Sequence, residues 1–138
     1  MREIWRNLQF MFAGVGAWVG WFLGGFDGFS YALVAFVTID YTTGVMRAFI
    51  QKELSSEVGA RGIFKKVLIF TLVGIGHIID SHVLGGGSAI RTAVVFFYLS
   101  NEGLSILENA VVIGLPIPDK LKVVLEQLRS EGDKNESK

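Results

Sequence analysis

The chain has 138 residues, of which 51% are hydrophobic and 19% charged, and its 13 Lys and Arg balance its 13 Asp and Glu. Zero net charge argues against the basic face that nucleic-acid binding needs, and the absence of cysteine excludes disulfides, thiol catalysis and Cys-based zinc sites. The length fits one domain or one membrane bundle.

Four apolar segments follow one another along the chain. Two Gly-rich turns, "GGFDGFS" and "VLGGGSA", and a longer polar loop, "QKELSSEVGARG", separate them. A helix needs roughly 20 mostly apolar residues to cross a membrane, and four such runs leave too little polar surface for a water-soluble globule. The sequence therefore predicts an all-α membrane protein with a membrane domain over residues 1–114. Its four transmembrane helices are expected at about 10–26, 29–50, 63–84 and 89–114.

A short amphipathic helix is predicted after the membrane domain, over residues 115–130. Pro116 and Pro118 end the preceding helix, and Asp119 can cap the next one. Residues 131–138 are expected to form a disordered, charged tail. The apolar positions of the short helix follow helical spacing at Leu121, Val124, Leu125 and Leu128.

The distribution of Lys and Arg between the segments predicts an orientation. The second connector and the C-terminal region are rich in them, whereas the first turn has none and the third has only Arg91. Cytoplasmic loops carry an excess of Lys and Arg, so four spans with both termini in the bacterial cytoplasm fit this alternation. The expected cytoplasmic basic flank consists of Arg47, Lys52, Arg61, Lys65 and Lys66.

Three glycines in the first segment, Gly16, Gly20 and Gly24, are spaced by four residues. Small residues at this spacing form a groove on one helix face and let another helix approach closely. We expect this face to pack tightly within the bundle or to pack copies of the chain into a homo-oligomer. The alternative is a Gly-rich helix without a specific partner.

Asp40 lies near the centre of the second segment, where an acid costs about 2.5–3.5 kcal/mol to insert. Thr43, Gly44 and Arg47 lie on or near the same helix face. Two interpretations stay open. Asp40 either ties its helix to a neighbour through hydrogen bonds or lines a water path.

The fourth segment carries a narrow polar stripe. Tyr98, Glu102, Ser105 and Asn109 follow helical spacing, and neighbouring polar residues widen the stripe. Such a helix can span a membrane with the stripe facing a lumen or a bundle seam, or lie flat at the interface. Its acids would be repelled by anionic lipid, which favours the span. The candidate pore-lining residues are Asp40, Thr43, Tyr98, Asn101, Glu102, Ser105, Glu108 and Asn109.

No pattern indicates an enzyme, a cofactor or a metal site. The chain lacks a phosphate loop and a nucleophile paired with a base. His77 and Asp80 are three residues apart, but His82 alone does not complete a metal site with them. They are better explained as polar groups at a helix end.

Taken together, several stretches resemble a phage holin family of Gram-positive bacteria that includes the clostridial toxin-secretion holins. They are "IDYTTGVMRAFI", "KELSSEVGARGIFKK", "HIID", "RTAVVFFYLSNEGLSILENA" and "GLPIPDKLKVVLEQL", which cover roughly residues 36–128. The N-terminal segment matches only in type. The residues that match the family motif are Asp40, Thr43, Gly44, Lys65, Lys66, Asp80, Asn101, Glu102, Glu108 and Asn109.

The resemblance implies a protein that oligomerises in the bacterial cytoplasmic membrane and opens lesions at a set time. A cell-wall hydrolase, or in some cases a toxin, then escapes without binding the holin directly, and the host lyses. We expect the polar stripe to be buried in the resting state and to turn toward water in the open state. The alternatives are a non-lytic small channel or transporter, and an antiholin-like membrane scaffold.

Overall fold

A computed structural model shows a helical protein and describes residues 1–124, 126 and 127. No strand occurs within these residues, which confirms the all-α prediction for the described chain. The third helix continues without a break into a π-helical turn, η1. The helices are α1 (Arg2–Leu23), α2 (Gly28–Ile50), α3 (Ser56–Ile78) with η1 (Ile79–Val83), and α4 (Ala89–Ile113).

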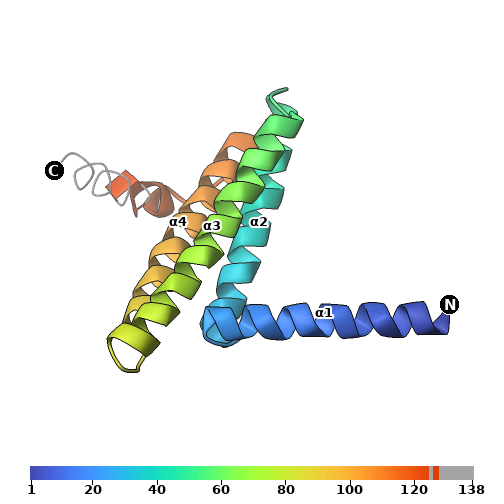
Figure 1. Ribbon diagram of the computed structural model, residues 1–138. Helices are drawn as coiled ribbons and strands as arrows, with labels where there is room; N and C mark the ends of the chain where they lie inside the picture. Colours follow the sequence, from blue (N-terminus) through green and yellow to red (C-terminus); the bar gives the residue numbers. More distant parts are fainter. Residues whose placement is uncertain (125, 128–138) are drawn as a thin grey trace.

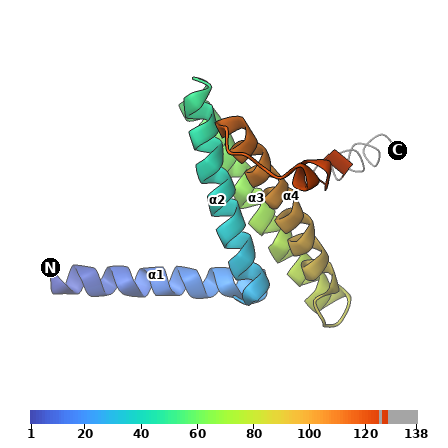
Figure 2. The same ribbon diagram turned by 180° about the vertical axis from the view of Figure 1, so that it is seen from behind.

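Helices α2, α3 and α4 lie side by side as an up-down-up bundle, and α1 extends crosswise from one end of it (Figures 1 and 2). The α2–α3 connection and the C-terminal end of α4 share one end of the bundle. The other end holds the α1–α2 turn and the connection from η1 to α4. The packing between α2 and α4 is the most extensive.

The apolar core lies toward the end of the bundle that joins α1. Every helix contributes to it, and Leu33, Val73 and Val95 are almost completely buried. Helix α1 adds only its last turns, through Val19, Phe22 and Leu23. The crosswise helix is therefore anchored by its C-terminal end alone.

Short polar caps and glycines explain where the helices begin and end. The side chains of Asp27 and Ser55 accept hydrogen bonds from the first-turn N–H groups of α2 and α3, at 2.9 and 3.2 Å. Helices α1 and α4 each end at a left-handed glycine, Gly24 (φ 84°) and Gly114 (φ 105°).

The structure corrects the expected bounds of two helices. The first begins at Arg2 rather than near residue 10, because the helix continues through a polar first turn, and it ends at Leu23. The third begins at Ser56 rather than near residue 63, behind the Ser55 cap. The second and fourth agree with the expected ranges to within a residue.

The expected number of membrane-crossing helices is also corrected. Two helices are long and apolar enough to span a bilayer, α2 and the continuous α3–η1 helix over Ser56–Val83, against four expected. Polar residues explain the difference, because they occupy the first turns of α1 and the middle of α4.

The expected C-terminal amphipathic helix lies partly within the described chain. Residues 119–124, 126 and 127 are helical, and the side chains of Leu121, Val123 and Val124 are exposed. Leu125, Leu128 and the predicted tail over 131–138 lie outside the described residues.

Candidate functional site

Three helices bring one basic and two acidic side chains together near the middle of the bundle. Lys66 Nζ of α3 pairs with Asp40 Oδ2 of α2 and donates to Glu102 Oε2 of α4 at 2.5 Å. The side chains of Asp40 and Glu102 are 8% and 4% exposed, and that of Lys66 is 18% exposed. The interior of the bundle is therefore held by a charged cluster, which we name the central triad.

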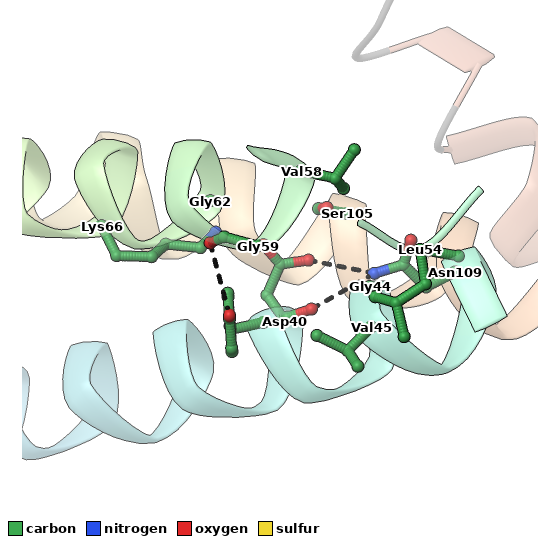
Figure 3. A pocket seen from close by; sticks show the side chains of 12 residues that line it. Asp40, Gly44, Val45, Leu54, Val58, Gly59, Gly62, Lys66, Ser105 and Asn109 are labelled. Carbon is green, nitrogen blue, oxygen red and sulfur yellow. Dashed lines mark hydrogen bonds and ion pairs between the residues drawn. The ribbon is translucent and has the colours of Figure 1, made fainter. Parts of the chain in front are cut away.

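Asn109 extends the central triad toward the end of the bundle that carries the α2–α3 connection. Its Nδ2 donates to Asp40 Oδ1 at 3.2 Å and to Thr43 Oγ1 at 3.0 Å. Arg47 Nη1 donates to the side-chain oxygen Oδ1 of Asn109 at 3.4 Å. Figure 3 shows Asp40 and Asn109 pointing toward one another between their helices. Helices α2 and α4 are thus joined by hydrogen bonds of Asn109 as well as by the ion pairs of the central triad.

Two hollows flank the central triad. The first, of about 200 Å³, is lined by Tyr41, Gly44, Gly59 and Gly62 together with triad residues (Figure 3). The second, of about 520 Å³, runs between α3 and α4 and is lined in part by Lys65, Asn101 and Ser105. The triad is therefore accessible from both sides of α3.

The residues of the polar stripe predicted on α4 differ in how deeply they are buried. Glu102 and Asn109 are buried against α2 and α3, and Asp40 faces them from α2. Tyr98 and Ser105 are half-buried and line the second hollow. Of the remaining candidates, Thr43 bonds to Asn109, Glu108 is half-buried, and Asn101 is exposed.

The basic flank predicted from the sequence does not stay together. Lys66, three turns inside α3, points into the bundle instead of facing solvent, because it lies on the face of α3 that meets Asp40 of α2 and Glu102 of α4. Arg47 is half-buried against Asn109. Lys52 and Lys65 are exposed, and the exposed Arg61 pairs with Glu57 at 3.2 Å.

The three spaced glycines meet different surroundings. A Cβ atom at Gly16 would meet nothing within 4 Å, whereas one at Gly20 would lie 2.9 Å from the Phe26 ring. Gly24 lies beyond the helix, where a Cβ atom would overlap His77 and Arg91. The role of these glycines between copies of the chain stays a prediction.

A second polar centre, around Arg91, lies where α1 meets the bundle, and the sequence did not single it out. The Arg91 guanidinium is buried and donates to the Leu23 carbonyl at 2.6 Å, the Gly25 carbonyl at 3.1 Å and Ser30 Oγ at 2.6 Å. It also pairs with Asp27 at 3.0 Å. The only sequence signal was one basic residue in an otherwise uncharged turn.

Charge and hydrogen bonds fix the ionised state of Asp27. The Arg91 guanidinium first, and then the Ser30 N–H, lower the pKa of this carboxyl from 3.8 to about 2. The α1–α2 joint therefore carries a paired carboxylate at neutral pH.

Asp80 caps the helix to which Arg91 belongs. It is completely buried, and its two carboxylate oxygens accept hydrogen bonds from the N–H groups of Ile90 and Arg91 at 2.9 Å. This agrees with the interpretation of Asp80 as a polar group at a helix end. Within the described residues, no cluster of three or more His, Asp or Glu could hold a metal ion.

The exterior of the bundle is apolar, also around the charged central triad. Phe49, Phe64, Leu68 and Phe97 are between 59% and 70% exposed, although the triad carboxylates are nearly buried. Soluble monomers rarely expose so much apolar surface. Every buried side-chain nitrogen or oxygen in the described part of the chain has a hydrogen-bond partner. An apolar exterior with all charged and polar groups of the interior paired suits a lipid environment.

Comparison with known proteins decides the family. The model of the bacteriophage holin family matches residues 17–130. The chain belongs to this family. A membrane location follows from family membership and agrees with the apolar exterior of the bundle.

Relatives of this holin-family chain occur in Gram-positive bacteria and in one of their phages. An uncharacterised 14.9 kDa protein in the nagH 3′ region of Clostridium perfringens is 37% identical over 95% of this chain and 99% of the relative. An uncharacterised protein of Listeria monocytogenes is 40% identical over 95% of this chain and 93% of its own length. A probable holin of Bacillus phage phi105 is 37% identical over 72% and 73% of the two chains. No solved structure matches the chain.

Proposed function

We propose that this chain oligomerises in the bacterial cytoplasmic membrane and permeabilises it, so that a cell-wall hydrolase or a toxin escapes and the host lyses. The activity is physical rather than enzymatic, and the released protein needs no binding site on the chain. One observation carries the proposal, the central triad enclosed by an apolar exterior. Such a cluster is stable in a closed bundle and is able to line water in an open assembly.

The proposed topology has three spans, α2, α3–η1 and α4. Helix α4 is included because it packs along α2 and its acidic residue Glu102 is paired inside the bundle rather than exposed to lipid. Lys52 lies in the α2–α3 connection and Arg61 in the second turn of α3, and Lys120 and Lys122 follow the C-terminal end of α4 at the same end of the bundle. The positive-inside tendency makes this end cytoplasmic. In place of two cytoplasmic termini on four spans, we propose a cytoplasmic C-terminus only.

In the proposed resting state the bundle is closed, and the ion pairs of the central triad within one copy of the chain support this state. Two carboxylates in hydrocarbon would be costly, and Lys66 offsets much of that cost by pairing with both. In the proposed open state, α4 turns away from α3 and the triad residues exchange their partners for water in a lumen between copies. Exposure of these groups to water makes assembly around a lumen favourable.

The experiment is inducible expression in bacteria with a membrane-potential dye, with and without a co-expressed cell-wall hydrolase. A holin gives a sudden loss of potential at a set time, followed by lysis only when the hydrolase is present. A graded ion leak would instead indicate a non-lytic channel or transporter. An unchanged potential would indicate an antiholin-like scaffold.

A further inference from the structure

The crosswise helix α1 leaves most of its surface without a partner in the chain. Every residue from Arg2 to Trp18 is exposed, whereas Val19, Phe22 and Leu23 enter the core of the bundle. Figures 1 and 2 show α1 leaving the bundle end and extending clear of it in both views. A 22-residue helix held at one end by its last turns needs something to cover its apolar side chains.

The apolar side chains of α1 form one face, and this face is continuous with the bundle core. Spacings of three and four residues place them in register with Phe22, which packs against the core. The apolar face therefore points to the side of α1 on which the bundle lies. If the bundle spans the membrane, the bilayer lies on this side of α1 too. Its exposed members are Ile4, Trp5, Leu8, Met11, Phe12, Val15 and Trp18.

The opposite face of α1 is polar and basic near its N-terminus. Helical spacing places Arg2, Arg6 and Gln9 together on it, and all three are exposed. A helix with cationic residues on one face and Trp, Phe and Leu on the other is typical of one that lies in the headgroup layer of a membrane. Phe10, four residues after Arg6, also lies on this side of the helix, and Glu3 and Trp21 lie next to it; Phe10 and Trp21 are exposed.

We propose that α1 lies flat on the non-cytoplasmic surface of the membrane, with its apolar face in the acyl boundary and Arg2 and Arg6 at the lipid phosphates. The proposal rests on the three-span topology given above. The end of the bundle that carries α1 is opposite the Lys- and Arg-rich end assigned to the cytoplasm. Lipid is the favoured partner, because the apolar face points to the side of α1 on which the spanning bundle lies and Arg2 and Arg6 suit lipid phosphates.

The joint between α1 and α2 holds this geometry. Gly24 and Gly25 adopt left-handed backbone conformations, with φ of 84° and 103°, and turn the chain out of the helix. Arg91 then binds the Leu23 and Gly25 carbonyls and the Asp27 carboxylate at once. A buried guanidinium that ties both sides of a turn makes the joint stiff, so that α1 is directed across the bundle.

The chain offers a direct measurement of this geometry because its three tryptophans, Trp5, Trp18 and Trp21, all lie in α1. Two single-tryptophan proteins retain Trp5 or Trp18 and carry Phe at the other positions. Each is placed in vesicles of phosphatidylglycerol and phosphatidylcholine with quencher groups at known acyl depths. If α1 lies flat, both tryptophans have the same shallow depth. If α1 spans the bilayer, the two tryptophans lie about 20 Å apart along the membrane normal, so that with Trp5 near the surface Trp18 lies near the bilayer centre.

Two outcomes would overturn the proposal. One is a Trp18 near the bilayer centre with Trp5 near its surface, which means a spanning helix. The other is the same weak quenching at every depth, relieved when the protein is diluted in lipid, which means that a second copy covers the apolar face. The vesicle measurement does not depend on lesion formation, so its failure is distinguishable from failure of the proposed function.

The side of the membrane on which α1 lies is tested separately by cysteine labelling. The chain lacks cysteine, so a single introduced cysteine is the only residue that reacts. Gln9→Cys on the polar face of α1 should react with a membrane-impermeant maleimide added to intact protoplasts. Lys52→Cys in the α2–α3 connection should react only after lysis. Labelling of Lys52→Cys but not of Gln9→Cys would place α1 on the cytoplasmic side and contradict the proposed location.

Discussion

Lys66 donates to Glu102 at 2.5 Å while the same ammonium pairs with Asp40, so that one cation on α3 joins acids on α2 and α4. Asp40 and Glu102 lie at the same level of the bundle, where two carboxylates alone would repel one another, and Lys66 between them turns that repulsion into attachment. The closed bundle therefore depends on the cation as much as on its apolar packing.

Replacement of Lys66 by Met tests this dependence. Removal of one member of a buried ion cluster leaves the others uncompensated, which costs about 3–5 kcal/mol in proteins. We expect Lys66→Met to lower the melting temperature in detergent clearly. Lys65→Met is the matched control, because Lys65 is adjacent in sequence and exposed. Equal melting temperatures for the two variants would show that the central triad does not stabilise the bundle.

The Asp27–Arg91 pair predicts a dependence of stability on pH. The pKa of Asp27 is lowered from 3.8 to about 2 in the folded protein, so its carboxylate contributes stability above about pH 4 and loses it as the pH falls toward 2. Asp27→Asn keeps the helix cap but lacks the charge. Thermal melts in detergent should show the wild type more stable than Asp27→Asn at pH 6, with the difference shrinking between pH 4 and 2. A difference that is independent of pH would contradict this origin.

Substitution of Gly24, at the α1–α2 joint, should lower the stability of the protein more than substitution of a glycine inside α1. At Gly24 a Cβ atom would overlap His77 and Arg91, and the left-handed backbone costs a non-glycine residue about 1–2 kcal/mol. Gly24→Ala should therefore destabilise the protein and weaken the anchoring of α1. Gly14→Ala is the control, since nothing lies within 4 Å and alanine favours a helix. Chemical denaturation of both variants measures the contrast, and equal stabilities would show that the joint is not strained by the added methyl.

Local sequence signals were sufficient for much of the fold. The turn before Gly28 and the Pro-rich stop after Gly114 placed α2 and α4 almost to the residue. The start of α3 was missed because hydropathy locates an apolar run and not the polar turns that precede it, although Ser55 offered a capping signal. This error placed Lys66 with the solvated flank.

Long-range partners were beyond reach of the sequence. The stripe on α4 indicated that Glu102 and Asn109 share a face, but spacing does not identify the helix that this face meets. Arg91 binds groups 61 to 68 residues away, and nothing local distinguishes it from a surface arginine. The crosswise position of α1 likewise depends on these distant hydrogen bonds rather than on the hydropathy of its own segment.

The time of membrane-potential collapse in cells that express Glu102 variants shows whether the buried polar residues come to line the lesion. We predict an abrupt collapse for the wild type, a collapse at a shifted time for Glu102→Gln, which keeps a polar group for water, and none for Glu102→Leu. Ser100→Leu, at an exposed position of the same helix, should keep the wild-type schedule. Collapse of Glu102→Leu on the wild-type schedule would contradict the claim that the buried polar residues come to line the lesion.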